Sequence, residues 1–253
     1  MAVQGDPRLP WEKQPVLSLP FLHRIAIFHS EGKRHLIAAT FAEGKEFQED
    51  WSRPGAVYAG RIPEVAGGSW RLDPVLEGIS RHHGMSIADW EGRPTLFVSG
   101  REGLFALRPD EGASRWPVRH LLRHDVSDMA VFDLDGDGNE EIATIEPFHG
   151  NRMVIYRTSN SGLKAVVEQE MTFGHVVWSG VIRGRRALIL GNRAGRKDLR
   201  ILRFRGDGSL DHETVVLDEG GGPANISVVH EPDRDLILCA NHARGEVALY
   251  EIG

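Results

Sequence analysis

The sequence has 253 residues, of which 41% are hydrophobic and 26% are charged, and its formal net charge is −6. These values are ordinary for a globular protein, and the absence of a Lys/Arg-rich stripe excludes an obvious nucleic-acid surface. No apolar run approaches the roughly 18 residues that suggest a membrane span, and the N-terminal stretch lacks the apolar core of a signal peptide. The single cysteine, Cys239, excludes a disulfide within the chain. We therefore expect a cytoplasmic protein without nucleic-acid or membrane partners.

Five segments of the chain repeat one plan, in which an alternating apolar strand is followed by a polar turn, a second apolar strand and a third. The first strands of these segments begin near His23, His83, Asp128, His175 and Asn225. Their spacing is close to the 40–50 residues expected of a repeat that forms a four-stranded propeller blade. The repeat predicts an all-β fold.

A fourth, more polar strand follows each of the first four segments, at 70–76, 116–122, 163–170 and 210–217. The fifth segment has none before the sequence ends at Gly253. The stretch 11–17 has the same pattern as 116–122, so we expect it to supply the outer strand of the last blade and to close the ring. The prediction is a single five-bladed β-propeller domain, with blades at about 18–76, 77–122, 123–170, 171–217, and 218–253 plus 11–17. An incomplete array or a β-sandwich is the alternative.

One loop is much longer than its counterparts in the other repeats. It spans 42–54, between the second and third strands of the first segment, and contains Phe47 and Trp51. Long loops in compact domains are usually functional or disordered, and the aromatic residues favour a functional element. We expect a lid or rim.

The turn between two strands of the third segment reads Asp133-Leu134-Asp135-Gly136-Asp137-Gly138-Asn139-Glu140-Glu141. Carboxylates at alternate positions, with glycines that permit positive φ, can surround a hard cation such as Ca²⁺. An EF-hand would need a Glu at the twelfth position and flanking helices. Position twelve is Thr144 and the flanks are apolar strands, so this is not an EF-hand.

The pattern D-x-D-G-D-G-x-x-E between two strands resembles the calcium loop of FG-GAP or VCBS repeats, which form propeller blades. The resemblance implies a Ca²⁺ ion held by the side chains of Asp133, Asp135, Asp137 and Glu141, with Asn139 offering its carbonyl oxygen. Because this turn joins the first strand to the second, we expect it on the face of the propeller opposite to the residues considered next. Its expected role is structural.

Polar residues collect where first strands start and second strands end, positions that share one face near the central channel. We expect a site at this axial face, beside the long loop. His83 and His175 are the candidate acid/base residues, and Arg101 and Arg193 are the candidates for binding an oxyanion or carboxylate. The candidate substrate-binding residues are His23, Arg24, Trp51, Glu102, Glu146, His149, Asn192, Asn225, Asn241 and His242.

Imidazole and carboxylate groups also suit a divalent metal, which would have to be held across blades because none of these candidate residues stands in a local HxxxH or HExxH spacing. A second divalent metal at the axial cluster is therefore a further expectation beside the calcium loop. Ligand binding without chemistry, or hydrogen bonding between blades, would also account for these residues.

The segment 81–90, with its continuation through 97–105, resembles the propeller of aldos-2-ulose dehydratase/isomerase and its bacterial relatives. That resemblance implies a small carbohydrate or keto-sugar ligand, and proton removal next to a carbonyl followed by loss of water. The leading hypothesis is a carbohydrate-active lyase, dehydratase or isomerase. A lectin-like propeller without turnover is the alternative, and so is a protein-interaction scaffold, which would require an exposed apolar patch that the sequence does not reveal.

Overall fold

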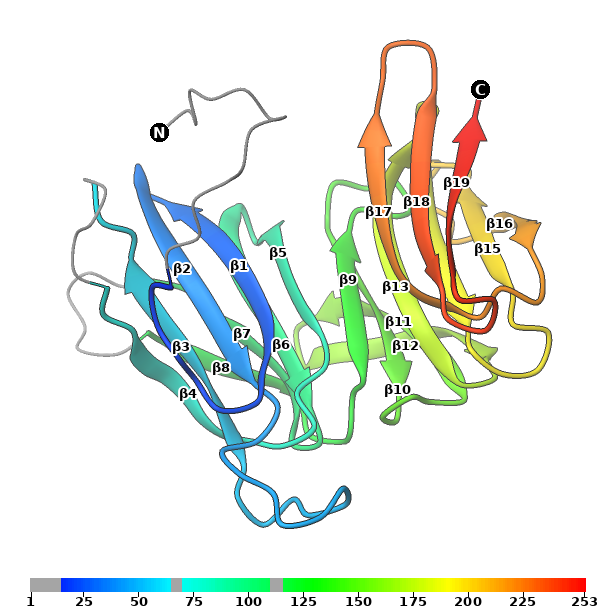
Figure 1. Ribbon diagram of the computed structural model, residues 1–253. Coiled ribbons are helices and arrows are strands. Elements are labelled where there is room, and N and C mark those ends of the chain that lie inside the picture. The colour runs from blue at the N-terminus through cyan, green and yellow to red at the C-terminus, as the bar shows by residue number, and fades with distance from the viewer. Residues whose placement is uncertain (1–14, 65–69, 110–115) are drawn as a thin grey trace.

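The computed structural model describes residues 15–64, 70–109 and 116–253. Within these residues, nineteen β-strands form five antiparallel sheets, in each of which neighbouring strands follow one another along the chain (Figure 1). The predicted five-bladed β-propeller is confirmed. No helix that could cross a membrane occurs in this part of the chain.

The first blade contains β1 (Leu22–Ser30), β2 (Lys33–Thr40), β3 (Gly55–Arg61) and β4 (Asp73–Ile79). The second contains β5 (Met85–Trp90), β6 (Arg93–Gly100), β7 (Gly103–Leu107) and β8 (Val118–Leu122). The third contains β9 (Asp128–Phe132), β10 (Glu141–Glu146), β11 (Arg152–Ser159) and β12 (Gly162–Glu170). The fourth contains β13 (Gly174–Ile182), β14 (Arg185–Asn192), β15 (Leu199–Phe204) and β16 (His212–Asp218). The fifth contains β17 (Pro223–His230), β18 (Asp235–Asn241) and β19 (Glu246–Ile252).

The fourth strand predicted for the last blade falls mainly on residues 11–14, which lie outside the described residues, and Pro15 to Leu17 are not in a strand. The long loop between β2 and β3 is confirmed as a loop, with one isolated bridge between Gly44 and Arg53.

The hydrophobic core lies between successive blades. Alternate side chains of a strand point to opposite faces of the sheet. The second strand of a blade between two others is buried on both faces, so its sequence is a continuous apolar run. Leu96, Phe97 and Val98 of β6 are examples, all 0% exposed: Leu96 and Val98 pack towards the first blade and Phe97 towards the third. Truncating such a residue to Ala costs about 2–5 kcal/mol.

The outward faces of the first and fifth blades differ from the other faces, because exposed apolar side chains lie on them. Ile25 and Ile27 of β1 are 67% and 55% exposed, and Val247 and Leu249 of β19 are 70% and 59% exposed. The alternating pattern places Ala26 of β1, and Tyr250 and Ile252 of β19, against adjacent blades. The sequence did not reveal these apolar faces, because their residues alternate with buried ones.

The two ends of the propeller carry different polar groups. β9 starts with Asp128 at the end of the molecule where the 42–54 loop lies, and it runs towards the acidic turn at the other end (Figure 1). Below, the axial mouth means the end at which the strands β1, β5, β9, β13 and β17 begin.

Candidate functional site at the axial mouth

Histidines from four different blades meet at the axial mouth. His23 comes from β1, His83 from the turn before β5, His149 from the turn after β10, and His175 from β13. The ring centroids of His83 lie 4.8 Å from His175, 5.2 Å from His149 and 5.4 Å from His23. With Arg24, Phe41, Phe148, Ala224 and Asn225 they line a cavity of about 370 Å³. The structure thus brings together two residues expected to act as acid or base and four expected to bind substrate.

Partial burial within this cluster keeps the imidazoles of His23, His149 and His175 neutral. Burial, and next the neighbouring His83, lowers the pKa of His23 and of His149 to about 4. The same two causes lower the pKa of His175 to about 3. Desolvation disfavours the charged imidazolium, and adjacent imidazoles and Arg side chains disfavour it further. Neutral imidazoles can accept a proton or bind a metal ion.

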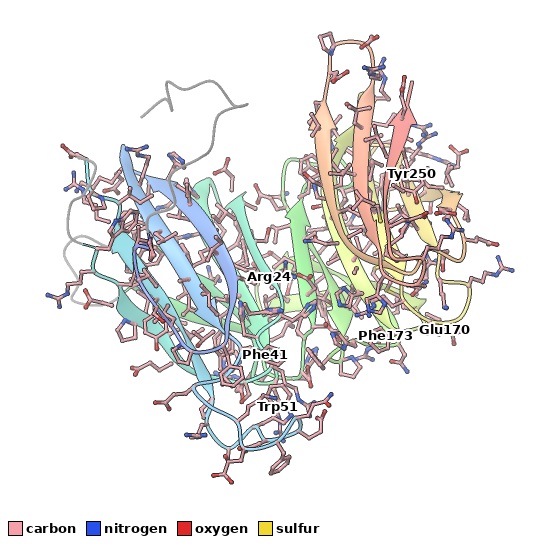
Figure 2. The ribbon with its side chains drawn as sticks, in the orientation of Figure 1. Arg24, Phe41, Trp51, Glu170, Phe173 and Tyr250 are labelled. Carbon is pink, nitrogen blue, oxygen red and sulfur yellow. The ribbon has the colours of Figure 1, made fainter. Side chains whose placement is uncertain are left out.

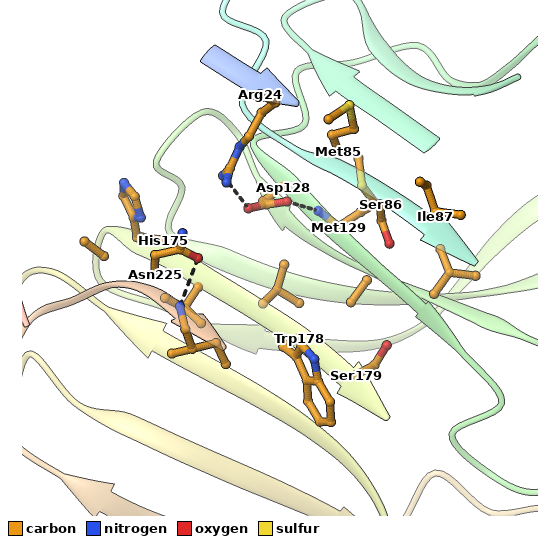
Figure 3. A pocket seen from close by; sticks show the side chains of 16 residues that line it. Arg24, Met85, Ser86, Ile87, Asp128, Met129, His175, Trp178, Ser179 and Asn225 are labelled. Atoms are coloured by element: carbon orange, nitrogen blue, oxygen red, sulfur yellow. Dashed lines mark hydrogen bonds and ion pairs between the residues drawn. The ribbon is translucent and has the colours of Figure 1, made fainter. Parts of the chain in front are cut away.

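Arg24 and Asp128 form the polar wall between the mouth and the central channel. Arg24 Nε donates to the carbonyl oxygen of His83 at 2.8 Å, and its Nη2 lies 3.7 Å from Asp128 Oδ2. The same carboxylate oxygen lies 3.7 Å from Nδ1 of His83. The channel beyond has a volume of about 310 Å³, and Trp178 and Ser179 lie deeper in it than His175 and Asn225 (Figure 3).

Aromatic and cationic residues form the rim of the mouth. Trp51 of the long loop packs edge-to-face on Phe41 with ring centroids 4.8 Å apart, and Lys45 Nζ lies 3.2 Å from the centroid of Trp51. Arg81 stands over both Trp51 and Phe148. Figure 2 shows Phe41 and Trp51 at the same end of the molecule as Phe173, which stacks on His149. The long loop therefore contributes to the rim, as expected of a lid element.

Of the two predicted anion-binding arginines, only Arg193 lies beside the cluster. Its guanidinium stands over Phe173, and its charge contributes to the lowered pKa of His149 and His175. Arg101 lines neither the mouth nor the channel. Glu102, the neighbouring predicted residue, accepts hydrogen bonds from the backbone N–H and the hydroxyl of Ser80 at 2.7 and 2.8 Å.

Glu146 lies in a separate cavity of about 630 Å³ that also contains His124 and Arg152. The Glu146 carboxylate is 1% exposed and accepts hydrogen bonds from the hydroxyls of Thr144 and Tyr156 at 2.8 and 2.9 Å. Arg152 Nη2 donates to it at 3.0 Å, and His124 Nε2 lies 3.1 Å away. Burial, followed by the charge of Glu146, raises the pKa of Tyr156. Glu146 is thus fully paired away from the mouth.

The three remaining predicted residues also lie outside the mouth cavity. Asn192 is buried, accepting from the backbone of Thr172 and donating to Asp198. Asn241 donates to Glu246 and to the hydroxyl of Tyr250, and His242 is exposed. These positions match those of the mouth residues in the repeat, but the side chains of Asn192 and Asn241 make hydrogen bonds within their own blades.

The sequence interpretation missed Phe41, Phe148 and Phe173, which surround the histidines. Each of the three lies close to a strand end at the mouth, as the predicted residues do. A search by position in the repeat alone would therefore have identified them. Selecting polar residues alone excluded them.

The acidic turn brings three of its expected ligands together. One carboxylate oxygen from each of Asp133, Asp135 and Glu141 lies within 4.8 Å of the others. Gly136 and Gly138 have φ of 84° and 90°, the left-handed conformation that lets the loop fold back on itself. The side chain of Asp137 is not part of this group, and its Oδ1 accepts from the backbone N–H of Asn139 at 2.7 Å.

Two arginines face this group of carboxylates. Arg157 contacts Asp135 through Nη2 and lies 3.4 Å from Glu141 through Nε, while Arg186 Nη2 donates to Asp133 at 3.0 Å. Asp135 and Glu141 are 0% and 1% exposed, and burial raises the pKa of Glu141 to about 7, with Asp135 adding to the rise. The donor set is all oxygen, which fits a hard cation, and the arginines already supply part of the positive charge.

No protein-family model and no curated protein matches the sequence. Among solved structures, an α-L-arabinofuranosidase from Clostridium thermocellum is similar to this chain with a TM-score of 0.50 and 11% identity, over 94% of this chain and 91% of that one. A leech intramolecular trans-sialidase gives a TM-score of 0.47 and 13% identity, over 91% of this chain and 42% of that one. At these identities the first likeness bears on the fold alone, and the second supports no conclusion.

Proposed function

We propose that the axial mouth is the active site of a carbohydrate-active enzyme, a lyase, dehydratase or isomerase that removes a proton next to a carbonyl group. One observation carries the proposal. Four imidazoles from four blades converge on a cavity of about 370 Å³ beside the guanidinium of Arg24. Such an array can move protons and stabilise a developing negative charge on oxygen. The resemblance of segment 81–105 to sugar dehydratases is consistent with this chemistry.

In the proposed reaction, His23 is the base, because its ring lies at the solvent side of the cluster. It takes the proton from the carbon next to the carbonyl, and the C–H electron pair forms the enediolate. Arg24 stabilises the charge on its oxygen. The protonated His23 then returns the proton either to a departing hydroxyl, which leaves as water, or to the neighbouring carbon. In the second case the hydroxyl proton of the first carbon passes to the oxygen of the former carbonyl, which completes an isomerisation. This assignment differs from the sequence prediction, which gave the proton transfers to the more deeply placed His83 and His175.

The test is turnover of a panel of keto sugars and uronates, with exchange of the substrate's proton for deuterium in D₂O followed by NMR. His23→Ala should lower kcat/KM by about 10²–10⁴-fold, as expected for loss of a general base. The matched control is His29→Ala, which removes an exposed imidazole farther along β1. Full turnover by His23→Ala would remove the role given to His23, and an absence of both exchange and turnover across the panel would contradict the proposed activity.

The arrangement favours one central site over the repeated sites of a lectin-like propeller. Equivalent positions at the ends of second strands carry Glu146, Asn192 and Asn241, and each is engaged in different hydrogen bonds within its own blade. Glycan binding near five equivalents per chain would instead support the lectin hypothesis.

For the acidic turn we propose a structural Ca²⁺ ion held by Asp133, Asp135 and Glu141. The support is the convergence of these three carboxylates, two of them buried, in a donor set made only of oxygen. Ca²⁺ should raise the melting temperature of the protein, and Asp135→Asn should abolish that rise. A calcium response unchanged by Asp135→Asn would contradict the assignment.

A further inference from the structure

The imidazoles of His83, His149 and His175 form a compact group of nitrogen donors. One ring nitrogen from each lies within 4.8 Å of the other two. The rings of His149 and His175 are stacked at 5.1 Å, and the ring of His83 stands edge-on to both. Because the three residues come from three blades, their convergence is a property of the assembled propeller and not of one turn.

Two of these imidazoles have a buried nitrogen that lacks a partner. His83 is only 4% exposed. Nδ1 of His83 and Nδ1 of His175 are both buried, and neither has a hydrogen-bond partner among the residues that the structure describes. Buried polar atoms without partners are rare, and each calls for an explanation. Nδ1 of His83 faces the carboxylate of Asp128, which leaves Nε2 of that ring for an ion, whereas a bound ion would itself explain Nδ1 of His175.

We propose that His83, His149 and His175 bind one divalent transition metal ion, for which Zn²⁺ is the best match. Neutral imidazole suits Zn²⁺, and three protein ligands with an open fourth position are typical of a catalytic zinc site. For zinc–nitrogen bonds of about 2.1 Å the nitrogens must approach to about 3.4 Å from one another, so the rings draw together on binding. The open position faces the mouth cavity.

Asp128 is placed to orient His83 in this site. Its Oδ2 lies 3.7 Å from Nδ1 of His83 and is itself 3.7 Å from Arg24. A small rotation closes the first distance to a hydrogen bond, and a carboxylate that accepts from a metal-bound imidazole fixes the ring and strengthens the ligand. The cations that face the cluster are Arg24 and Arg193. The carboxylate of Asp128, 3.7 Å from Arg24, offsets the charge of Arg24.

The metal would polarise the substrate oxygen beside Arg24 while His23, which is not among the three ligands, remains free to move the proton. This role of the metal rests on the proposed function, whereas metal binding itself does not. Binding and turnover are therefore measured separately.

The experiment is a titration of the chelator-treated full-length protein with Zn²⁺ and Co²⁺, in excess Ca²⁺ so that the acidic turn is occupied by its preferred ion. We expect one equivalent of Zn²⁺ by calorimetry and elemental analysis, and the visible absorption of tetrahedral Co²⁺. His149→Asn and His175→Asn should each weaken binding by at least about 100-fold, and Asp128→Asn by about 10–100-fold. Asn suits position 149 because His149 has φ of 49°, a conformation that Asn tolerates.

The matched controls are His29→Asn and His124→Asn, which remove imidazoles outside the cluster and should leave the affinity for Zn²⁺ unchanged. His23→Ala should also retain Zn²⁺. Absence of stoichiometric binding, or binding by His149→Asn and His175→Asn equal to that of the unmodified protein, would overturn the metal site. Zn²⁺ binding without turnover would remove the proposed function alone, and full turnover after metal removal would remove the metal's role alone.

Discussion

The histidine cluster and the acidic turn lie at opposite ends of the propeller, and they satisfy their polar atoms in different ways. In the acidic turn, each carboxylate oxygen of Asp135 and Glu141 already faces a donor from the backbone or from Arg157. In the histidine cluster, buried nitrogens of His83 and His175 have no donor or acceptor among the described residues. The protein's own contacts therefore hold the acidic turn in shape, and a cation there would add to them, whereas the unfilled positions in the histidine cluster leave room for a ligand. The difference suggests a structural role for the turn and a functional role for the cluster.

Removal of a buried carboxylate from the acidic turn should have the largest effect on stability. Glu141→Ala leaves the guanidinium of Arg157 and the backbone N–H of Leu134 without one of their acceptors. Breaking a buried pair from one side costs about 3–5 kcal/mol. Urea denaturation should show that loss, while Asp137→Ala in the exposed part of the same turn should cost less than about 1 kcal/mol. Equal losses would show that the buried carboxylates are not what holds the turn.

Acid should weaken the mouth through His82, which is fully buried next to the cluster. Burial lowers the pKa of His82 to about 3. In the unfolded chain His82 has the ordinary histidine pKa of 6.5. Below that pH the unfolded chain takes up a proton that the folded chain does not. His82 alone should therefore lower the free energy of unfolding by about 1.4 kcal/mol per pH unit from pH 6.5 towards pH 3, when a chelator keeps the protein free of metal. His23, His149 and His175 add contributions of the same sign.

The measurement is urea denaturation at several pH values for the unmodified protein and for His82→Gln, whose amide can still donate to the carbonyl oxygen of Ser99. The variant should show a shallower decline with falling pH. An identical pH dependence for the two proteins would mean that His82 does not titrate on unfolding.

In contrast to the acidic turn, the histidine cluster should tolerate the loss of a ring. His149→Asn removes stacking on Phe148 and Phe173 but no hydrogen bond of the ring that the structure records. Aromatic pairs contribute about 0.5–1.5 kcal/mol each beyond the area they bury, so we expect a loss near the lower end of that range. A loss as large as that of Glu141→Ala would remove the distinction between the two regions.

The rim should have the smallest effect on the fold and act on substrate binding. Trp51→Ala removes the surface on which Lys45 and Phe41 pack. As a substrate-binding residue, Trp51 would contribute a stacking contact of about 1 kcal/mol, whose loss corresponds to roughly a five-fold rise in KM with an unchanged kcat. Steady-state kinetics would test this, with Phe47→Ala, an exposed aromatic in the same loop, as control. A fall in kcat would place Trp51 closer to the chemistry than the rim.

The fold was predictable because its signal repeats. The alternation and spacing of five segments located the strands to within a few residues, as at 163–170, where β12 spans Gly162–Glu170. The position of a residue in the repeat also predicted that His23, His83, His149 and His175 would share one face.

Side-chain direction at that face was not predictable. Glu146 and Asn192 occupy equivalent places at the ends of second strands, yet Tyr156 and Asp198 draw them into hydrogen bonds within their own blades. Tyr156 and Asp198 do not stand at the repeat positions from which the site was predicted, so only the packed structure reveals these contacts. Similarly, the spacing of the acidic turn predicted its ligands, but it gave no sign that Arg157 would approach from another strand.

The origin of the three clustered imidazoles in three separate blades has a consequence for the order in which the molecule assembles. The donors are far apart in the chain, and they meet only after the second, third and fourth blades have packed on one another. A free metal ion therefore cannot template early folding through this cluster, and its uptake would report the packing of these three blades. Stopped-flow refolding with a metal-sensitive dye could thus time that packing step.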